Sequence, residues 1–329
     1  MRTLVAVVGL YGLLASACGS AETADERREL ALSSIVVDYP GGAQRLIEFS
    51  YEHERLQKVE VSSTRRGVET RHQVRYDSAG RVSIIELMQF DEFLGPTNPD
   101  ESTFKYSDDG LLIEVLSRFG PRIFRYGDQR KIKAIQYLKP SGLLDEDWAF
   151  VRDNDGPVTA YSITRFWNLV DTPNETTPLA ENATYLFESS GQVSSIDLQD
   201  RSNGVDTERA GTAYLRHDEA GRLTEVFVDV GLRWNMTAPV EFQVRYNDAG
   251  MVNEIARYTV RNGTRRLFSS TSFSYETFVL REFRFITEEI LPWHVAPFFD
   301  LSGRLETEPD VISSAVSDTL GITSFGLSQ

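Results

Sequence analysis

Hydrophobic and polar residues alternate in short runs along most of the chain. In EFQVRY (241–246) and PRIFRY (121–126), the apolar or aromatic side chains tend to stand two residues apart, with polar ones between them. A period of two is typical of β-strands that bury one face, whereas the longer period of amphipathic helices is scarce here. The pattern therefore predicts an all-β protein.

A short motif recurs along the chain, and its glycines are spaced about 30 residues apart in most intervals, a period that indicates a repeat architecture. The clear copies read YDSAGRVSII (76–85), YSDDGLLIEV (106–115), RDNDGPVTAY (152–161), FESSGQVSSI (187–196), HDEAGRLTEV (217–226) and YNDAGMVNEI (246–255). FDLSGRLETE (299–308) is a shortened copy, YGDQRKIKAI (126–135) and YEHERLQKV (51–59) lack the glycine, and YETFVLREF (275–283) is the weakest member.

Each copy predicts a β-hairpin. An Asp, Asn or Ser at the first turn position accepts a backbone N–H, and a glycine three residues later adopts the left-handed conformation that completes a type I turn. Asp77 and Gly80 are the cleanest instance. Apolar residues follow two and five positions after the glycine, as at Val82 and Ile85, so strict alternation breaks there. This offset predicts a β-bulge just after the turn.

Other turns connect the hairpins. Asn262-Gly263 favours a tight two-residue turn, and residues 65–67 (RRG) can turn the chain between two strands. A single hairpin buries too little apolar surface to offset its loss of backbone entropy, so the repeats must pack side by side. We expect an antiparallel meander of repeated hairpins that forms a large twisted or curled sheet, with a partly closed barrel or a sandwich as alternatives.

The N-terminus has the layout of a secretory signal peptide. One basic residue, Arg2, precedes an apolar stretch that is too short to cross a bilayer and is followed by small residues. The only cysteine, Cys18, comes directly after Ala15-Ser16-Ala17, which resembles the lipobox of bacterial lipoproteins, although that family usually has Leu at the position of Ala15. The alternative is an ordinary signal peptide that leaves Cys18 as a free thiol.

The lipoprotein resemblance implies cleavage before Cys18 and attachment of lipid to its sulfur. Two or more acyl chains make such an anchor effectively stable, so the protein would lie on a membrane. Gly19 after the cysteine implies sorting to the outer membrane if the host has one. We therefore expect a signal peptide at residues 1–17, a lipidated cysteine and flexible tether at 18–34, a β-repeat domain at 35–308 and a C-terminal tail at 309–329.

The repeats resemble the YD repeats of bacterial Rhs and teneurin-type proteins, in which an aromatic residue, Asp, two variable residues, Gly and Arg are followed by apolar positions. YDSAGRV and HDEAGRL are the best matches, and the likeness covers roughly residues 49–308. The resemblance implies a β-shell. The chain has few repeats and no Asp-Pro-x-Gly self-cleavage motif, so the better comparison is a small, single-domain YD-repeat lipoprotein.

The charge and residue types exclude several classes of function. The formal net charge of −15 repels phosphate backbones, so nucleic acid is a poor partner. Only four histidines are present, and no His-x-x-x-His pair, nucleophile elbow or phosphate-binding glycine loop occurs. We expect no catalytic residue, no metal site and no cofactor apart from the covalent lipid on Cys18. A transmembrane barrel is an alternative, but charged segments such as QRKIKAIQYLK disfavour a lipid-facing surface.

Carboxylates are numerous, as in Asp108-Asp109, Asp145-Glu146-Asp147 and the pair Asp153 and Asp155. They leave open an envelope glycan hydrolase with two facing carboxylates, and the turn clusters could bind calcium weakly. Most of them fall at predicted turn tips, where Asp is favoured for backbone hydrogen bonding. His217, Asp218 and Glu219 look like an acid–base cluster, yet in the other copies an aromatic residue usually stands at the position of His217.

Three tryptophans lie between the glycine turns and are candidate ligand-binding residues: Trp148, Trp167 and Trp234. They could form an aromatic platform for a glycan or peptide, although such residues more often cap the core. The irregular segments 91–103 and 167–184 are the expected places for recognition, and sheet edges offer pairing with a partner strand. The sequence as a whole predicts a lipid-anchored cell-envelope protein whose β-repeat scaffold binds a glycan or an envelope protein, or has a structural role.

Overall fold

The computed structural model describes residues 29–53, 55–91, 95–152, 156–166, 179–188, 191–202, 205–206, 211–229, 239–278 and 299. The strands are β1 (Glu29–Asp38), β2 (Gln44–Glu52), β3 (Arg55–Ser63), β4 (Gly67–Tyr76), β5 (Val82–Asp91), β6 (Gly95–Pro96), β7 (Asp100–Tyr106), β8 (Leu112–Ser117), β9 (Gly120–Tyr126), β10 (Ile132–Leu138), β11 (Leu144–Arg152), β12 (Val158–Arg165), β13 (Leu179–Phe187), β14 (Val193–Ser202), β15 (Val205–Asp206), β16 (Gly211–His217), β17 (Leu223–Val228), β18 (Val240–Tyr246), β19 (Val252–Arg261) and β20 (Thr264–Phe278). Apart from one 3-10 turn at Asp128–Arg130, the described residues contain no helix, which confirms the all-β prediction.

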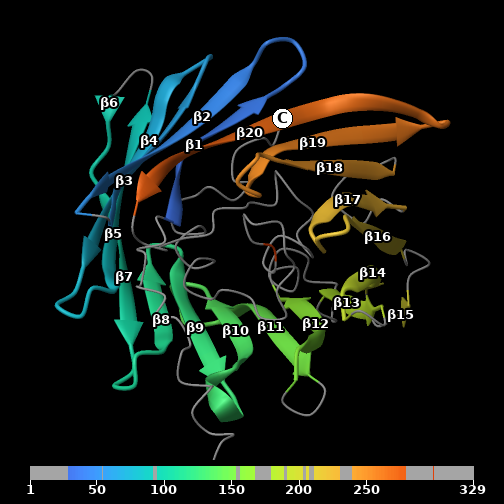
Figure 1. Ribbon diagram of the computed structural model, residues 1–329. Helices are drawn as coiled ribbons and strands as arrows, with labels where there is room; N and C mark the ends of the chain where they lie inside the picture. Colours follow the sequence, from blue (N-terminus) through green and yellow to red (C-terminus); the bar gives the residue numbers. More distant parts are fainter. Residues whose placement is uncertain are drawn as a thin grey trace, which may run out of the picture.

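The strands form one antiparallel meander that closes on itself. Each long strand pairs with the next along the chain, and β1 pairs with both β2 and β20 (Figure 1). The two-residue strands β6 and β15 pair only with β5 and β14, which also pair with β7 and β16. The ring therefore contains 20 − 2 = 18 strands. Of the predicted alternatives the barrel is correct, and its closure is complete. The expectation of a free sheet edge is wrong for this ring, because every one of its strands has two neighbours.

Closure gives the ring two different ends. The motif turns, from the one between β2 and β3 to the one between β18 and β19, all lie at one end of the ring. The strands that precede these turns all run in the same direction along the barrel. We call this end of the ring the turn end. The opposite end, here the loop end, carries the remaining connections, including those after β5, β12 and β17. β1 starts and β20 finishes at the turn end, where Glu29 is opposite Phe278.

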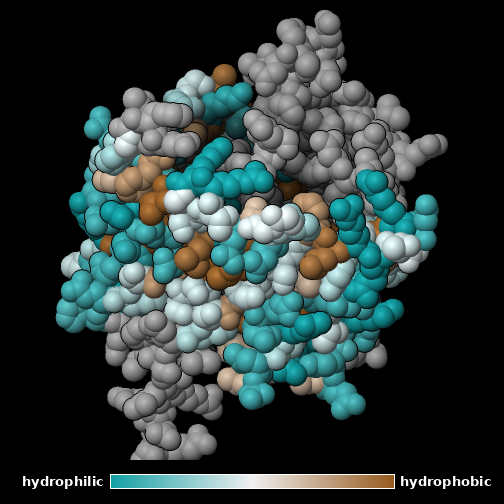
Figure 2. All heavy atoms as spheres, turned by 90° about the horizontal axis from the view of Figure 1, so that it is seen from above, coloured by the Kyte–Doolittle hydropathy of each residue, from teal (hydrophilic) through white to brown (hydrophobic). Residues whose placement is uncertain are grey.

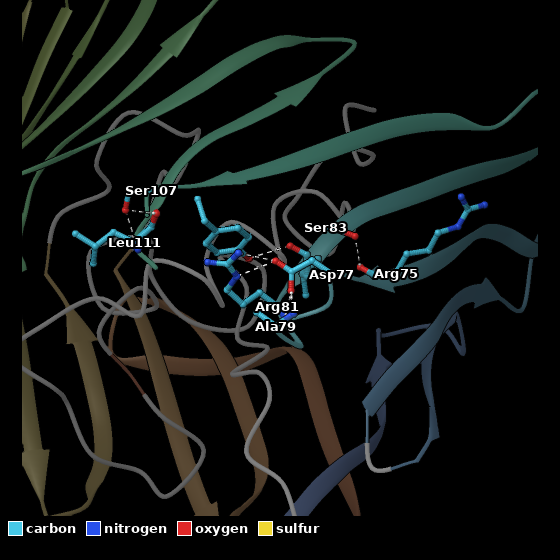
Figure 3. Close-up of polar contacts among 9 residues, drawn as sticks. Arg75, Asp77, Ala79, Arg81, Ser83, Ser107 and Leu111 are labelled. Atoms are coloured by element: carbon cyan, nitrogen blue, oxygen red, sulfur yellow. Dashed lines mark hydrogen bonds and ion pairs between the residues drawn. The ribbon is translucent and has the colours of Figure 1, made fainter. Parts of the chain in front are cut away.

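The motif turn is stabilised by its own Asp (Figure 3). In the copy at 76–85, Asp77 Oδ1 accepts the backbone N–H groups of Ala79 and Arg81, both at 2.9 Å. Gly80 has φ +80°, a conformation that L-residues rarely adopt. The register shifts between Arg75 and Tyr76, and the hydroxyl of the bulged Ser83 donates to the Arg75 carbonyl at 3.1 Å. The predicted hairpin and bulge are both confirmed.

The aromatic residue of each motif links neighbouring repeats. The Tyr106 hydroxyl donates to the carbonyl of Val82, two residues after the glycine of the preceding copy, at 2.9 Å. Arg81 forms an ion pair with Asp77 at 2.7 Å and stacks over the Tyr106 ring at 4.4 Å. Equivalent hydroxyl-to-carbonyl bonds join Tyr51 to Leu32, Tyr76 to Leu56, Tyr126 to Leu112, Tyr246 to Leu223 and Tyr275 to Val252.

One copy keeps this link without an aromatic ring. Arg152 stands at the position of the tyrosine, and its guanidinium donates to the Ile132 carbonyl at 3.1 Å. The glycine-free copy at 126–135 makes its turn with Gln129 and Arg130 at φ +57° and +63°. The link between repeats is therefore kept even where the motif letters change.

The inner and outer faces of the ring differ sharply in polarity. The inward side chains form a single apolar cluster that includes Ile35, Val74, Tyr161 and Phe242. Outward residues form cross-strand ion pairs at equivalent repeat positions: Lys105 with Glu114 at 2.8 Å, Arg216 with Glu225 at 3.4 Å and Arg245 with Glu254 at 2.9 Å. In Figure 2 hydrophilic residues cover much of the coloured surface, with hydrophobic patches between them. Exposed apolar side chains such as Val151, Leu186 and Tyr214 stand between these pairs. A lipid-facing barrel presents an uncharged outer band, so the ion pairs argue against that alternative.

Phe299 belongs to the same inward cluster, although it is not part of the ring strands. It is 2% exposed and packs with the buried residues of the strands. The sequence predicts Phe299 as the first residue of a shortened motif copy, and the rest of that copy lies outside the described residues. Chain from beyond β20 therefore contributes to the interior of the ring.

Several predicted boundaries can be compared with the strands. β1 begins at Glu29, so the strand region starts within the stretch predicted as tether rather than at residue 35. The turn at 65–67 joins β3 to β4, and Asn262 and Gly263 both have positive φ in the turn between β19 and β20, as predicted. The predicted signal peptide at 1–17, Cys18 and the tail at 309–329 lie outside the described residues.

One histidine is buried on the wall between apolar neighbours. His72 on β4 is 0% exposed and stands between Val59 on β3 and Leu87 on β5. Burial lowers its pKa from 6.5 to about 4, and a backbone contact with Val59 opposes that shift. Between about pH 4 and pH 6.5 the folded chain therefore keeps the His72 ring neutral, whereas the unfolded chain would protonate it.

The sign of the resulting pH dependence follows from the lowered pKa. The stabilising contribution of neutral His72 is complete above pH 6.5 and is lost as the pH falls from 6.5 to about 4, by about 3 kcal/mol in total. Replacing His72 by Leu should flatten the dependence of the unfolding free energy on pH in this window, as measured by urea denaturation. A residual slope of the same sign should remain, because burial also lowers the pKa of His217.

His53 provides the matched control, since its side chain is 90% exposed. H53Q should keep the slope of the parent protein. An unchanged slope in H72L would show that His72 is not the group that titrates.

Candidate functional site

A ladder of polar side chains crosses four strands near the loop end. Arg122 on β9 is opposite Tyr137 on β10, Tyr137 is opposite Glu146 on β11, and Glu146 is opposite Arg165 on β12. The next inward positions along these strands are Phe124, Ile135, Trp148 and Ile163, which pack in or against the apolar cluster. Alternation along each strand puts both rows on the same face of the sheet. We call Arg122, Tyr137, Glu146 and Arg165 the mouth ladder.

The charged side chains of the mouth ladder are largely withdrawn from water, and two of them form an ion pair. Arg165 Nε lies 3.0 Å from Glu146 Oε2, and the two side chains are only 12% and 22% exposed. Trp148 Nε1–H donates to the other oxygen of Glu146. Arg122 is 9% exposed, with its guanidinium 5.8 Å from the Tyr137 ring centre. A polar site built into a partly apolar surface combines orientation with shape, which is the composition that recognition sites use.

Aromatic rings pack below the ladder toward the centre of the wall. Trp148 is half-buried and stacks parallel to Tyr161, with ring centres 5.9 Å apart. Tyr161 also contacts Phe150 and Tyr185, and burial raises the pKa of Tyr185 well above its ordinary value. Trp148 thus packs against the core, while its role in ligand binding stays a prediction. Trp167 and Trp234 lie outside the described residues.

The most exposed apolar side chains are at the tips of two adjacent loop-end turns. Phe119, between β8 and β9, is 71% exposed, and Leu143, between β10 and β11, is 63% exposed. The turns touch, because a Cβ atom added at Gly120 would lie 1.9 Å from the Leu138 carbonyl oxygen. Arg118 stacks over the Phe119 ring at 4.6 Å. We call Phe119 and Leu143 the loop-tip pair.

Sequence reasoning did not identify the loop-tip pair or the mouth ladder. Phe119 and Leu143 each adjoin a glycine in a short turn, where an apolar side chain has little chance of burial. A large apolar residue beside a turn glycine was therefore the sequence signal that could have identified them. The ladder carries no comparable signal, because its successive members are 15, 9 and 19 residues apart in the sequence and meet only through strand register.

The residues that suggested acid–base chemistry are structural at the turn end. Asp218 Oδ1 accepts the N–H groups of Ala220 and Arg222 at 3.0 and 2.9 Å, and its second oxygen pairs with the Arg222 side chain. The pKa of this carboxyl is lowered by these bonds to Arg222 and Ala220 against the opposing effect of desolvation. His217 occupies the aromatic position of the motif, and burial lowers its pKa, opposed by Glu188 and Asp218.

Among the other carboxylates named above, Asp109, Asp145 and Glu146 have turn or ion-pair partners, whereas Asp147 Oδ1 is buried without a hydrogen-bond partner from the described residues. Asp109 accepts from Ser107 and pairs with Arg130, Asp145 lies 3.5 Å from Lys139, and Glu146 pairs with Arg165. Asp153 and Asp155 lie outside the described residues. Within the described part of the chain, no group of three or more His, Cys, Asp or Glu side chains is arranged to hold a metal ion. None of the described residues form a helix with the length and apolarity needed to span a membrane.

Comparisons with known proteins give only distant likenesses. No protein-family model and no curated protein sequence matches the chain. Among solved structures, a porin-like protein from Bacteroides uniformis aligns with 74% of this chain and 96% of its own, at 10% identity and a TM-score of 0.42. A porin-like protein from Bacteroides vulgatus aligns with 75% and 99%, at 10% identity and a TM-score of 0.37.

The crystal structure of TcdB2-TccC3 is also similar over part of its length. It aligns with 71% of this chain but only 16% of its own, at 13% identity and a TM-score of 0.30. At this level of similarity none of the three structures supports a conclusion about function. The resemblance to YD repeats stays a prediction from the sequence motif.

Breaking the buried ion pair of the mouth ladder should lower the unfolding free energy more than breaking an exposed ion pair. Replacing Arg165 by Gln leaves Glu146 partly buried without its charged partner, which should lower the unfolding free energy by about 2 kcal/mol or more. Arg245→Gln removes a matched cross-strand pair whose arginine is 62% exposed, and it should cost less than about 1 kcal/mol. Equal costs in urea denaturation would contradict the distinction.

Proposed function

We propose that this protein is a lipid-anchored cell-envelope scaffold that binds an envelope protein through its loop end. The observation that carries the proposal is the polarity of the closed ring. Charged pairs on the outer wall favour contact with water, and the apolar cluster makes the wall a rigid support. The loop end is where this support carries exposed apolar tips next to a polar ladder.

The loop-tip pair supports a protein as the bound partner. Phenylalanine, leucine and arginine side chains that protrude from a rigid surface gain free energy when a partner removes them from water. Phe119, Leu143 and Arg118 provide this combination on two touching turns. The residues Trp148, Trp167 and Trp234, predicted to bind a ligand, remain candidates for additional contacts with the partner. A glycan is the other class of partner that the sequence suggests.

The proposal involves no chemical step by the turn-end carboxylates. Asp77 and Asp218 are occupied by backbone N–H groups and by the arginines that stack on the next repeat. Glu146 near the loop end is likewise engaged by its ion pair with Arg165.

The lipid anchor is tested by replacing Cys18 with Ser. The variant should move from the membrane fraction to the aqueous fraction, and its mass should lack the acyl chains, since the thioether can no longer form. Ser20→Ala, a small change just beyond the predicted lipobox, should leave both properties as they are. A C18S protein that remains in the membrane fraction with unchanged mass would refute the anchor.

Partner binding is tested by photo-crosslinking in intact cells. A benzoylphenylalanine in place of Phe119 should give a discrete, light-dependent protein adduct, and adding Leu143→Ser should reduce its yield. The same photoreactive residue in place of Leu186, which is 43% exposed on β13, is the matched control and should give no such adduct. Identical adducts at both positions, or none at 119, would count against the loop end as the binding surface.

A further inference from the structure

The position at which the chain enters the ring limits the orientation of the barrel relative to an anchoring membrane. β1 begins at Glu29, at the turn end, and from its first residue it is paired with β20. Further along it also pairs with β2, from Ser34 to Asp38. The first strand is therefore held on the wall, and any segment that connects it to an anchor leaves from the turn end.

The connecting segment is short compared with the barrel. From Cys18 to Glu29 there are 29 − 18 = 11 residue steps, which span at most about 40 Å when fully extended. Strands of seven to ten residues that tilt as barrel strands do make a wall about 20–25 Å high. A loop end that faced the membrane would need residues 19–28 to run back along the whole wall and use more than half of this reach.

From this we infer that the turn end faces the anchoring membrane and that the loop end points away from it. The inference rests on the proposed function, because it takes Cys18 as the anchored residue. It adds the direction of approach: the partner that contacts Phe119 and Leu143 reaches the barrel from the aqueous side. A protein embedded wholly in the same bilayer cannot reach the loop-tip pair without extending past the wall.

The charged outer wall is consistent with this orientation. A barrel lying on its side would press pairs such as Lys105–Glu114 and Arg245–Glu254 against the membrane and partly desolvate them. With its axis upright, the barrel keeps these pairs in water on all sides. The turn end instead presents short hairpin tips, which carry small exposed residues such as Ser78 and Ala79 and acidic ones such as Asp108.

Energy transfer to the membrane tests the orientation. Ser78 at the turn end and Ser141 at the loop end are both exposed serines in short turns. Each is changed to Cys in the full lipidated chain and labelled with the same maleimide donor, and the protein is reconstituted in phosphatidylethanolamine–phosphatidylglycerol vesicles that carry a headgroup-linked acceptor. The donor at 78 should lose more of its emission to the acceptor than the donor at 141.

The possible outcomes separate the orientation from the anchor. Equal losses at the two positions, or a larger loss at 141, would overturn the inferred orientation while leaving the anchor intact. If neither donor loses emission and the protein does not float with the vesicles, the anchor itself fails, and with it the proposed function. Circular dichroism of each labelled protein checks that the ring is folded.

Discussion

The structure depends on the contact that ties each repeat to the next. A tyrosine hydroxyl donates to a backbone carbonyl of the preceding copy, and the arginine of that copy stacks on the tyrosine ring while its own Asp holds it in place. A hairpin alone would not be stable, so this contact turns a series of weak units into a continuous wall. The motif letters Tyr, Asp, Gly and Arg thus each have a defined role in turn formation or in the link between repeats.

Ring closure then separates the functions of the two ends and two faces. The inner face is occupied by the apolar cluster, the outer face by charged pairs, and the turn end by the motif turns. Only the loop end has connections of varied length and sequence. The proposed recognition surface lies at that end, where residues are not constrained by the contact between repeats and a rigid wall keeps them in place.

Much of the fold could be predicted from local sequence, since hairpins are local structures. Asp77 with Gly80, the offset of Val82 and Ile85, and Asn262-Gly263 each fix a turn or bulge within a few residues. Closure could not be predicted in the same way, because the pairing of Glu29 with Phe278 depends on how curvature accumulates over all the intervening strands. The mouth ladder was missed for a related reason: the register of β9 to β12 brings Arg122 and Arg165 into one row, and no short motif encodes it.

The burial of Phe299 connects the number of repeats to the chain that follows them. A ring of eighteen strands is wide enough to enclose space that its own side chains do not fill, and Phe299 packs into that interior from beyond β20. Gain or loss of one hairpin would alter the ring by two strands and change the enclosed volume. Duplication of a repeat in evolution would then leave voids or crowding unless the packing of Phe299 changed with it. Repeat number and the residue at position 299 should therefore evolve together, although each hairpin by itself looks interchangeable.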